Sequence, residues 1–146
     1  MSVATPSLPA MSFPHPWRVL GSLTHIDLVW HDGGDMGETD HEAGTISLRR
    51  GMTWAQRRST LIHECLHVLR GPSLDTLEDR EELRVEKESA RWLLPDVRVI
   101  GEALAWSHSR AEAADELHVD ERTLAIRLRY LHPSERGYLH ERLEHL

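Results

Sequence analysis

Apolar positions that recur every three or four residues predict a long amphipathic helix from Thr53 to Arg70. Its apolar stripe consists of Trp54, Leu61, Ile62, Cys65, Leu66 and Leu69. Thr53 is placed to cap the start of this helix, and Gln56, three residues on, completes a capping-box pattern. Gly71 and Pro72 end it. The pattern therefore delimits one helix at both ends.

The region before this helix has strand-like patterns. His25 to Trp30 and Thr45 to Arg50 combine β-branched or aromatic residues with partial alternation. Between them, His31 to Gly37 is rich in Gly and Asp, which is typical of a turn. We therefore expect an antiparallel hairpin just before the helix. The segment Trp17 to Leu23 fits either a short helix or a strand, and the pattern leaves that choice open.

Helical patterns fill most of the remaining chain after a predicted loop at 72–79. The expected helices are Glu81 to Leu94, Val97 to Ser107, Ser109 to Leu117, Glu121 to Leu131 and Ser134 to Leu143. Pro95 ends the first of them, and Ser134 is the expected N-cap of the last. These elements predict an α+β fold with a small antiparallel sheet. We expect a disordered arm at 1–16, a domain at 17–107 and a helical segment at 108–146 packed on it.

Composition narrows the class of protein. The 146 residues suffice for one domain with a small appendage, and no apolar run approaches the length of a membrane span. The first 16 residues lack the basic and apolar regions of a secretory signal. A single cysteine excludes an intramolecular disulfide, which fits a cytoplasmic location. A formal net charge of -7 argues against non-specific binding of nucleic acid by the whole chain.

The predicted helix 53–70 contains the sequence His63-Glu64-Cys65-Leu66-His67, an HExxH motif. Residues four apart lie on one face of a helix, so both imidazoles point to one spot and can form half of a zinc site. Glu64 lies about 100° round the helix and can act as general base on a metal-bound water. Cys65 points nearly away from the two imidazoles, and we expect it to be a buried core thiol.

A catalytic zinc site usually has a third protein ligand, which the helix 81–94 can supply. Glu82 and Glu86 lie four residues apart and share a face with small and apolar residues. We expect Glu82 to ligate the metal and Glu86 to accept a hydrogen bond from a ligand imidazole. The choice between Glu82 and Glu86 as third ligand stays open, as does a solvated face of acids without a metal. We expect one Zn²⁺ per chain, although Mn²⁺ or Fe²⁺ would also suit two His and one Glu.

Two segments, Thr60 to His67 and Glu82 to Pro95, carry a family resemblance. With the sequence between and after them, roughly Trp30 to Leu143, the chain resembles the ImmA/IrrE family of metallopeptidase-like proteins. It is similar to the short members found in actinobacteria and their phages. Glu86 and Glu88 stand where the family commonly has Asn and Phe.

The resemblance implies a zincin-like fold, in which a small antiparallel sheet packs on the metal helix. It also implies zinc-dependent endopeptidase activity that cleaves or inactivates a DNA-binding repressor and so relieves repression of a mobile element or stress regulon. The strand Thr45 to Arg50 would be the sheet edge to which an extended substrate adds as a further strand.

Near the C-terminus, Ala111 to Leu131 resembles a helix-turn-helix, with a turn at residues 119 and 120. Arg122, Arg127 and Arg129 could contact phosphates of DNA. However, the chain from residue 109 to 146 contains six Arg and eight acidic residues, a poor balance for DNA binding. Packing or docking is therefore favoured over DNA binding. The rival to the peptidase is a non-proteolytic regulator that binds DNA or a repressor and has a structural or vestigial metal site.

Overall fold

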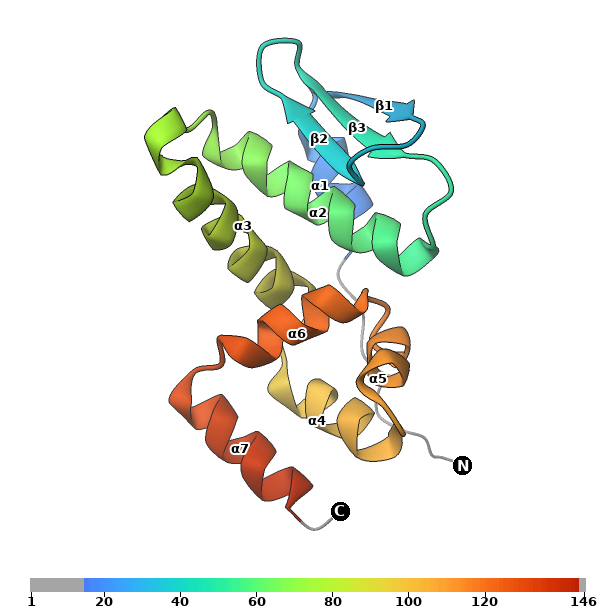
Figure 1. The fold of residues 1–146 in the computed structure, drawn as a ribbon, viewed down its shortest axis with the longest axis vertical. Coiled ribbons are helices and arrows are strands. Elements are labelled where there is room, and N and C mark those ends of the chain that lie inside the picture. Colours follow the sequence, from blue (N-terminus) through green and yellow to red (C-terminus); the bar gives the residue numbers. More distant parts are fainter. Residues whose placement is uncertain (1–14, 145–146) are drawn as a thin grey trace. The chain divides into compact units, whose positions relative to one another are not determined.

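The computed structural model describes residues 15–144, which fall into two compact units, His15–Ser89 and the chain from Ala90 onward (Figure 1). The chain is α+β, with a three-stranded mixed sheet in the first unit. The expected disordered arm lies outside the described residues except for its last two, of which Pro16 already begins a helix. Within 15–144, no helix is both long and apolar enough to cross a membrane. The expected domain boundary after residue 107 stays a prediction.

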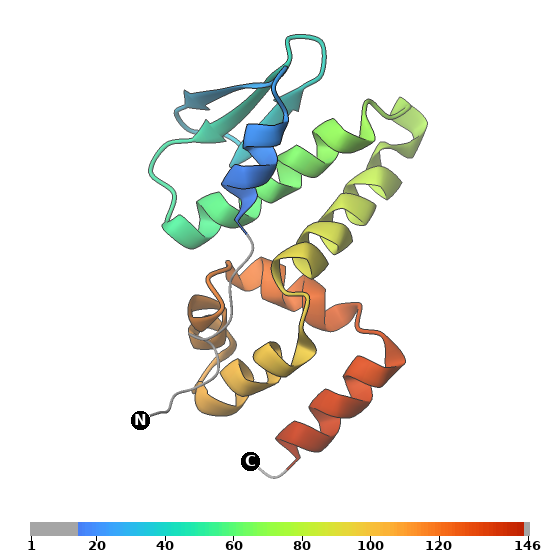
Figure 2. The same cartoon turned by 180° about the vertical axis from the view of Figure 1, so that it is seen from behind.

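The first unit combines a sheet with the long motif-bearing helix. Its helices are α1 (Pro16–Ser22), α2 (Trp54–Arg70) and the beginning of α3 (Glu78–Leu93), which follows the short 3₁₀ helix η1 (Asp75–Leu77). Its strands are β1 (Asp27–His31), β2 (Gly37–Asp40) and β3 (Thr45–Arg49). Figure 2 shows α1 lying against α2. The segment that the sequence left open is therefore a helix, with Pro16 in its first turn.

The sheet differs from the predicted antiparallel hairpin. Its strand order is β1-β3-β2, with β1 parallel to β3 and β2 antiparallel to β3. The region between the predicted strands is more than a turn, because β2 forms there and makes a hairpin with β3. Gly33, Gly34 and Gly44 have positive φ angles near 70°, which let the chain reverse before and after β2. β3 is the central strand, so the expectation that it forms the sheet edge was wrong.

The helix α2 has the predicted ends. The Thr53 hydroxyl accepts a hydrogen bond from the Gln56 N–H, and the Gln56 side chain accepts one from the Thr53 N–H. Gly71, with φ 80°, ends the helix. Leu61, Ile62 and Cys65 are fully buried, as are Ile46 and Leu48 of β3. The helix thus packs one face on the sheet and anchors the motif to a core.

The second unit consists of the end of α3 followed by four helices. They are α4 (Val97–Trp106), α5 (Arg110–Glu116), α6 (Glu121–Arg129) and α7 (Pro133–Leu143). Asp96, Ser109 and Asp120 each cap the helix that follows with a side-chain oxygen. α7 begins at Pro133 rather than after it, and its N-cap is His132 rather than the expected Ser134, because proline is well suited to the first helical turn.

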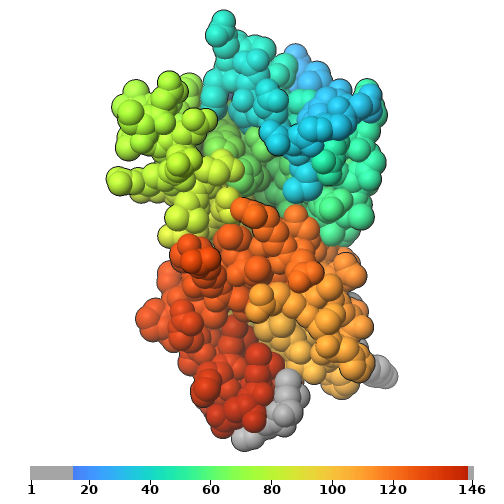
Figure 3. Space-filling view, in the orientation of Figure 1, coloured from blue at the N-terminus to red at the C-terminus, as the bar shows by residue number. Residues whose placement is uncertain are grey.

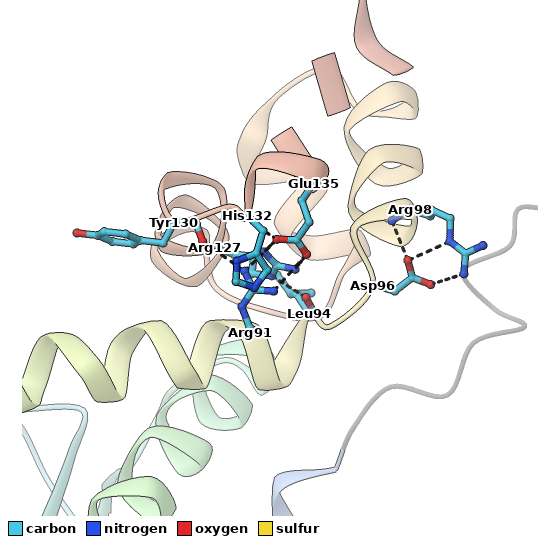
Figure 4. Close-up of polar contacts among 8 residues, drawn as sticks. All are labelled: Arg91, Leu94, Asp96, Arg98, Arg127, Tyr130, His132 and Glu135. Atoms are coloured by element: carbon cyan, nitrogen blue, oxygen red, sulfur yellow. Dashed lines mark hydrogen bonds and ion pairs between the residues drawn. The ribbon is translucent and has the colours of Figure 1, made fainter. Parts of the chain in front are cut away.

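An ion-pair cluster holds the second unit together (Figure 4). The Arg127 side chain is 1% exposed and donates to the Glu135 carboxylate at 2.7 Å and to the Leu94 carbonyl at 2.7 Å. Arg91 donates to the same carboxylate at 2.9 Å and to the Tyr130 carbonyl at 3.3 Å. Arg127 is therefore committed to internal bonds and, of the three Arg residues that could contact DNA phosphates, it is not available to do so.

Candidate metal centre

Three of the predicted site residues converge within the first unit. His63 Nε2 lies 2.7 Å from one carboxylate oxygen of Glu82, and His67 Nε2 lies 2.8 Å from the other. The two imidazole rings are 4.9 Å apart between centroids. Among residues 15–144, His63, His67 and Glu82 form the one group of three metal-ligand side chains that meet in this way. The geometry brings together the two motif histidines and the Glu favoured as third ligand.

The connection between α2 and α3 explains why Glu82 reaches the histidines. α2 ends at Gly71 and α3 begins seven residues later, so the chain reverses and the two helices lie side by side near the turn (Figures 1 and 2). Arg70 at the end of α2 donates to the Glu81 carboxylate, at 3.0 Å from Nη2, and to Glu88 at 3.2 Å. These ion pairs hold the first turns of α3 against the end of α2, which positions the neighbouring Glu82.

The three side chains are open to solvent on one side. The side chains of His63 and His67 are each 21% exposed and that of Glu82 is 45% exposed. In the space-filling view, the green atoms of α2 are recessed between the cyan β2 hairpin and the yellow-green α3 (Figure 3). Water can therefore reach this group of side chains.

Glu64 lies beside the cluster, in a different environment. The residue is only 6% exposed, and its carboxylate oxygen Oε1 accepts a hydrogen bond of 2.8 Å from the Thr39 hydroxyl of β2. Burial raises the pKa of Glu64, while the charge of a protonated His63 and the Thr39 hydrogen bond act in the opposite direction. A buried carboxylate next to two imidazoles is suited to accept and return a proton.

Cys65 is buried and separate from the cluster, as the sequence predicted. Burial, with a smaller contribution from the charge of Glu64, raises the pKa of its thiol to about 12. The thiolate form that binds metals is therefore scarce at neutral pH. Cys65 contributes packing to the core of the first unit, and the metal-ligand chemistry is left to nitrogen and oxygen donors.

The donor set fits a zinc ion. Tetrahedral ligands at about 2.1 Å from zinc stand about 3.4 Å apart, so the 2.7 and 2.8 Å contacts would have to open by less than about 1 Å. Two neutral imidazoles and one carboxylate leave the fourth position of a four-coordinate site for water. Glu86 lies one turn further along α3 than Glu82, and its predicted bond to an imidazole stays a prediction.

Sequence reasoning missed two residues of this site, Gly37 and Thr39, because it missed the strand that carries them. A Cβ atom on Gly37 would lie 2.5 Å from Thr60 Cγ2 and 3.0 Å from the Cγ and Oε2 atoms of Glu64. β2 therefore approaches α2 more closely than a strand with a side chain at position 37 could. The alternation of these two small residues in Gly37–Asp40 was the only signal in the sequence.

The chain matches no family model, no curated protein and no solved structure.

Proposed function

We propose that this chain is a zinc-dependent endopeptidase that cleaves or inactivates a DNA-binding repressor, and so relieves repression of a mobile element or a stress regulon. The observation that carries the proposal is the convergence of His63, His67 and Glu82 beside the buried Glu64. The substrate class comes from the resemblance of the two motif segments to the ImmA/IrrE family. A peptidase that acts on such a repressor would work in the cytoplasm.

In this function His63, His67 and Glu82 would hold the metal. Zinc supplies a Lewis acid that polarises a peptide carbonyl and lowers the pKa of a water. Glu64 accepts a proton from the attacking water and delivers it to the leaving amine, so its carboxylate is needed in the charged form at the start of the cycle. The burial of Glu64 keeps bulk water from competing for that carboxylate.

The substrate would bind along β2, which replaces β3 as the proposed edge. The Arg49 N–H donates to the Met36 carbonyl at 2.8 Å, so residues 36 and 49 form a hydrogen-bonded pair. Such pairs alternate along an antiparallel ladder, and Gly37 and Thr39 therefore direct their backbone groups away from β3. An extended polypeptide can add to those groups as a further strand next to Glu64.

The burial of Arg127 favours a protein partner over DNA. With that side chain bound to Glu135 and Leu94, the helix-turn-helix-like segment α5–α6 loses one of the three Arg side chains available for phosphates. The acidic net charge of -7 also opposes contact with a polyanion and suits a repressor with basic surfaces. The partner in this proposal is therefore the repressor itself.

The test compares the zinc-loaded wild type with Glu64→Gln, which keeps the size of the side chain. Both proteins are incubated with a peptide library made from a bacterial proteome, and new termini are identified by mass spectrometry. We expect the wild type to produce new termini and Glu64→Gln to produce them at least about 100-fold more slowly, because the general base is lost. Zinc content, measured by elemental mass spectrometry, should be the same in both proteins.

Equal cleavage by the two proteins, or cleavage that survives removal of the metal with a chelator, would contradict the peptidase. Zinc bound by both proteins without any cleavage would favour the rival, a regulator that separates a repressor from DNA without proteolysis. Absence of zinc from both proteins after reconstitution would exclude the metal site as well.

A further inference from the structure

The hydroxyl of Thr39 makes two close approaches to Glu64. Its oxygen lies 2.8 Å from Oε1 of the carboxylate and 3.2 Å from the backbone carbonyl oxygen of the same residue. The hydroxyl has one proton to donate, and the shorter contact to the charged acceptor is the stronger of the two. A residue of the edge strand β2 therefore holds the Glu64 carboxylate of α2.

Thr39 is well suited to hold a side chain in one orientation. Because it is β-branched, its χ1 rotation is restricted, and its residue is held by pairing with Ile46 in the sheet. Glu64, by contrast, has three rotatable side-chain bonds, and holding such a side chain in one orientation costs conformational entropy. A stiff donor on a paired strand reduces the orientations open to a flexible acceptor.

Gly37 lets this contact form. Gly37 and Thr39 lie two residues apart on β2, so they face the same side of the sheet, toward α2. With no side chain at residue 37, the strand lies close enough for the hydroxyl of Thr39 to reach Glu64. The two residues act together: Gly37 allows the close approach of β2 to α2, and Thr39 donates the hydrogen bond to Glu64.

We propose that Thr39 is a positioning residue: its hydroxyl fixes the Glu64 carboxylate in the orientation from which Glu64 exchanges protons with water and the leaving amine. The proposal rests on the proposed peptidase function for its catalytic consequence. Oε1 is held by Thr39, which leaves Oε2 without that bond and available for the transferred proton. The backbone of Thr39 also faces the open edge of β2, so the residue that would pair with the substrate is the one that orients the base.

The first test reads the carboxylate directly and does not need a substrate. Chain labelled with ¹³C at the Glu side-chain carboxyl gives a Glu64 signal that is identified by its loss in Glu64→Gln. Thr39→Val removes the hydroxyl and keeps the shape, while Thr39→Ser keeps the hydroxyl. We expect the Glu64 signal to move in Thr39→Val and to stay near the wild-type position in Thr39→Ser. Thr45→Val, which removes a hydroxyl from the opposite face of the sheet, is the matched control and should leave the signal unchanged.

A Glu64 signal that is the same in wild type and Thr39→Val would overturn the proposal. Thermal unfolding and zinc content accompany each variant, and we expect both to be close to wild type for Thr39→Ser. If Thr39→Val fails to fold, Thr39→Ser still decides, since a displaced Glu64 signal in the presence of the hydroxyl would also contradict the proposed bond.

The second test uses a peptide that the wild type cleaves in the library experiment. We expect Thr39→Val to lower kcat by about tenfold or more with KM nearly unchanged, and Thr39→Ser to restore most of kcat. Equal kcat in both variants and the wild type would overturn the positioning role. If the wild type cleaves nothing, the proposed peptidase fails, whereas the carboxyl signal still decides whether Thr39 holds Glu64.

Discussion

At the scale of single residues, the candidate site depends on which glutamate meets the two histidines. The sequence left Glu82 and Glu86 both open, because they share a face of one helix. The structure brings both carboxylate oxygens of Glu82 to the two Nε2 atoms, at 2.7 and 2.8 Å. One side chain thus spans both imidazoles, so Glu82 rather than Glu86 is the third member of the candidate site.

Substitution of each glutamate by glutamine separates these roles. We expect Glu82→Gln to weaken zinc binding by more than the roughly 10–100-fold that loss of an outer hydrogen-bond partner costs, because a charged ligand is removed. Glu86→Gln should lose no more than that 10–100-fold. Competition titrations with a chromophoric zinc chelator measure both affinities. Loss of zinc in Glu86→Gln together with its retention in Glu82→Gln would reverse the assignment.

At the scale of elements, the site requires β2 to lie closely against α2. We expect Gly37→Ala to destabilise the fold by about 1–3 kcal/mol, because the new methyl group would overlap Thr60 Cγ2 and the strand or the helix must shift. Chemical denaturation of the full chain measures the change in the free energy of unfolding. The same shift should weaken the contact between Thr39 and Glu64.

Gly21→Ala is the control for this experiment. It lies in α1 of the same unit, has no atom within 4 Å of an added Cβ, and should be neutral or stabilising by up to about 1 kcal/mol. If Gly37→Ala were as stable as Gly21→Ala, the close packing of β2 on α2 would be excluded.

The elements also show what the sequence could predict. The start and end of α2 were predicted correctly because Thr53, Gln56 and Gly71 give local signals that do not depend on the rest of the chain. β2 was missed because its four residues, Gly37 to Asp40, include no apolar side chain. The parallel pairing of β1 with β3 was missed because alternation identifies a strand but not the direction of its neighbour.

The same difference explains which site residues were predicted. His63, Glu64 and His67 follow one another on a single helix, so helical geometry alone places them. Glu82 needs the reversal between α2 and α3, which sequence spacing suggests but does not fix. Thr39 needs a strand and its register, and it became visible only in the folded chain.

At the scale of the whole molecule, the two units are stabilised by different kinds of interaction. The first unit packs a sheet on a long helix, with Ile46, Leu48, Leu61 and Ile62 fully buried. After α3, the second unit has only short helices of 7 to 11 residues. The Glu135 carboxylate at the start of α7 accepts hydrogen bonds from Arg127 of α6 and Arg91 of α3, and so links three helices. The most distant of these residues in sequence, Arg91 and Glu135, lie 44 residues apart. The candidate metal site draws on residues of the first unit alone.

The ion-pair cluster gives the second unit a specific dependence on acid. Hydrogen bonds from Arg127 and Arg91 hold the pKa of Glu135 well below its usual range, so the folded chain binds this proton less readily than the unfolded chain. The stabilisation is therefore present above the unfolded pKa of about 4.3 and is lost as the pH falls below that value toward the folded pKa.

We expect Glu135→Gln to lower the melting temperature at pH 7, where it leaves the buried Arg127 without its charged partner. The difference from wild type should narrow progressively below about pH 4.3, where the Glu135 carboxylate binds a proton in the unfolded wild-type chain but still stays charged in the folded one. Melting curves of both proteins, recorded from about pH 3 to about pH 7, measure the effect. Glu141→Gln, on the exposed side of α7, is the control. A difference that stays constant over this range would show that Glu135 acts through its shape rather than its charge.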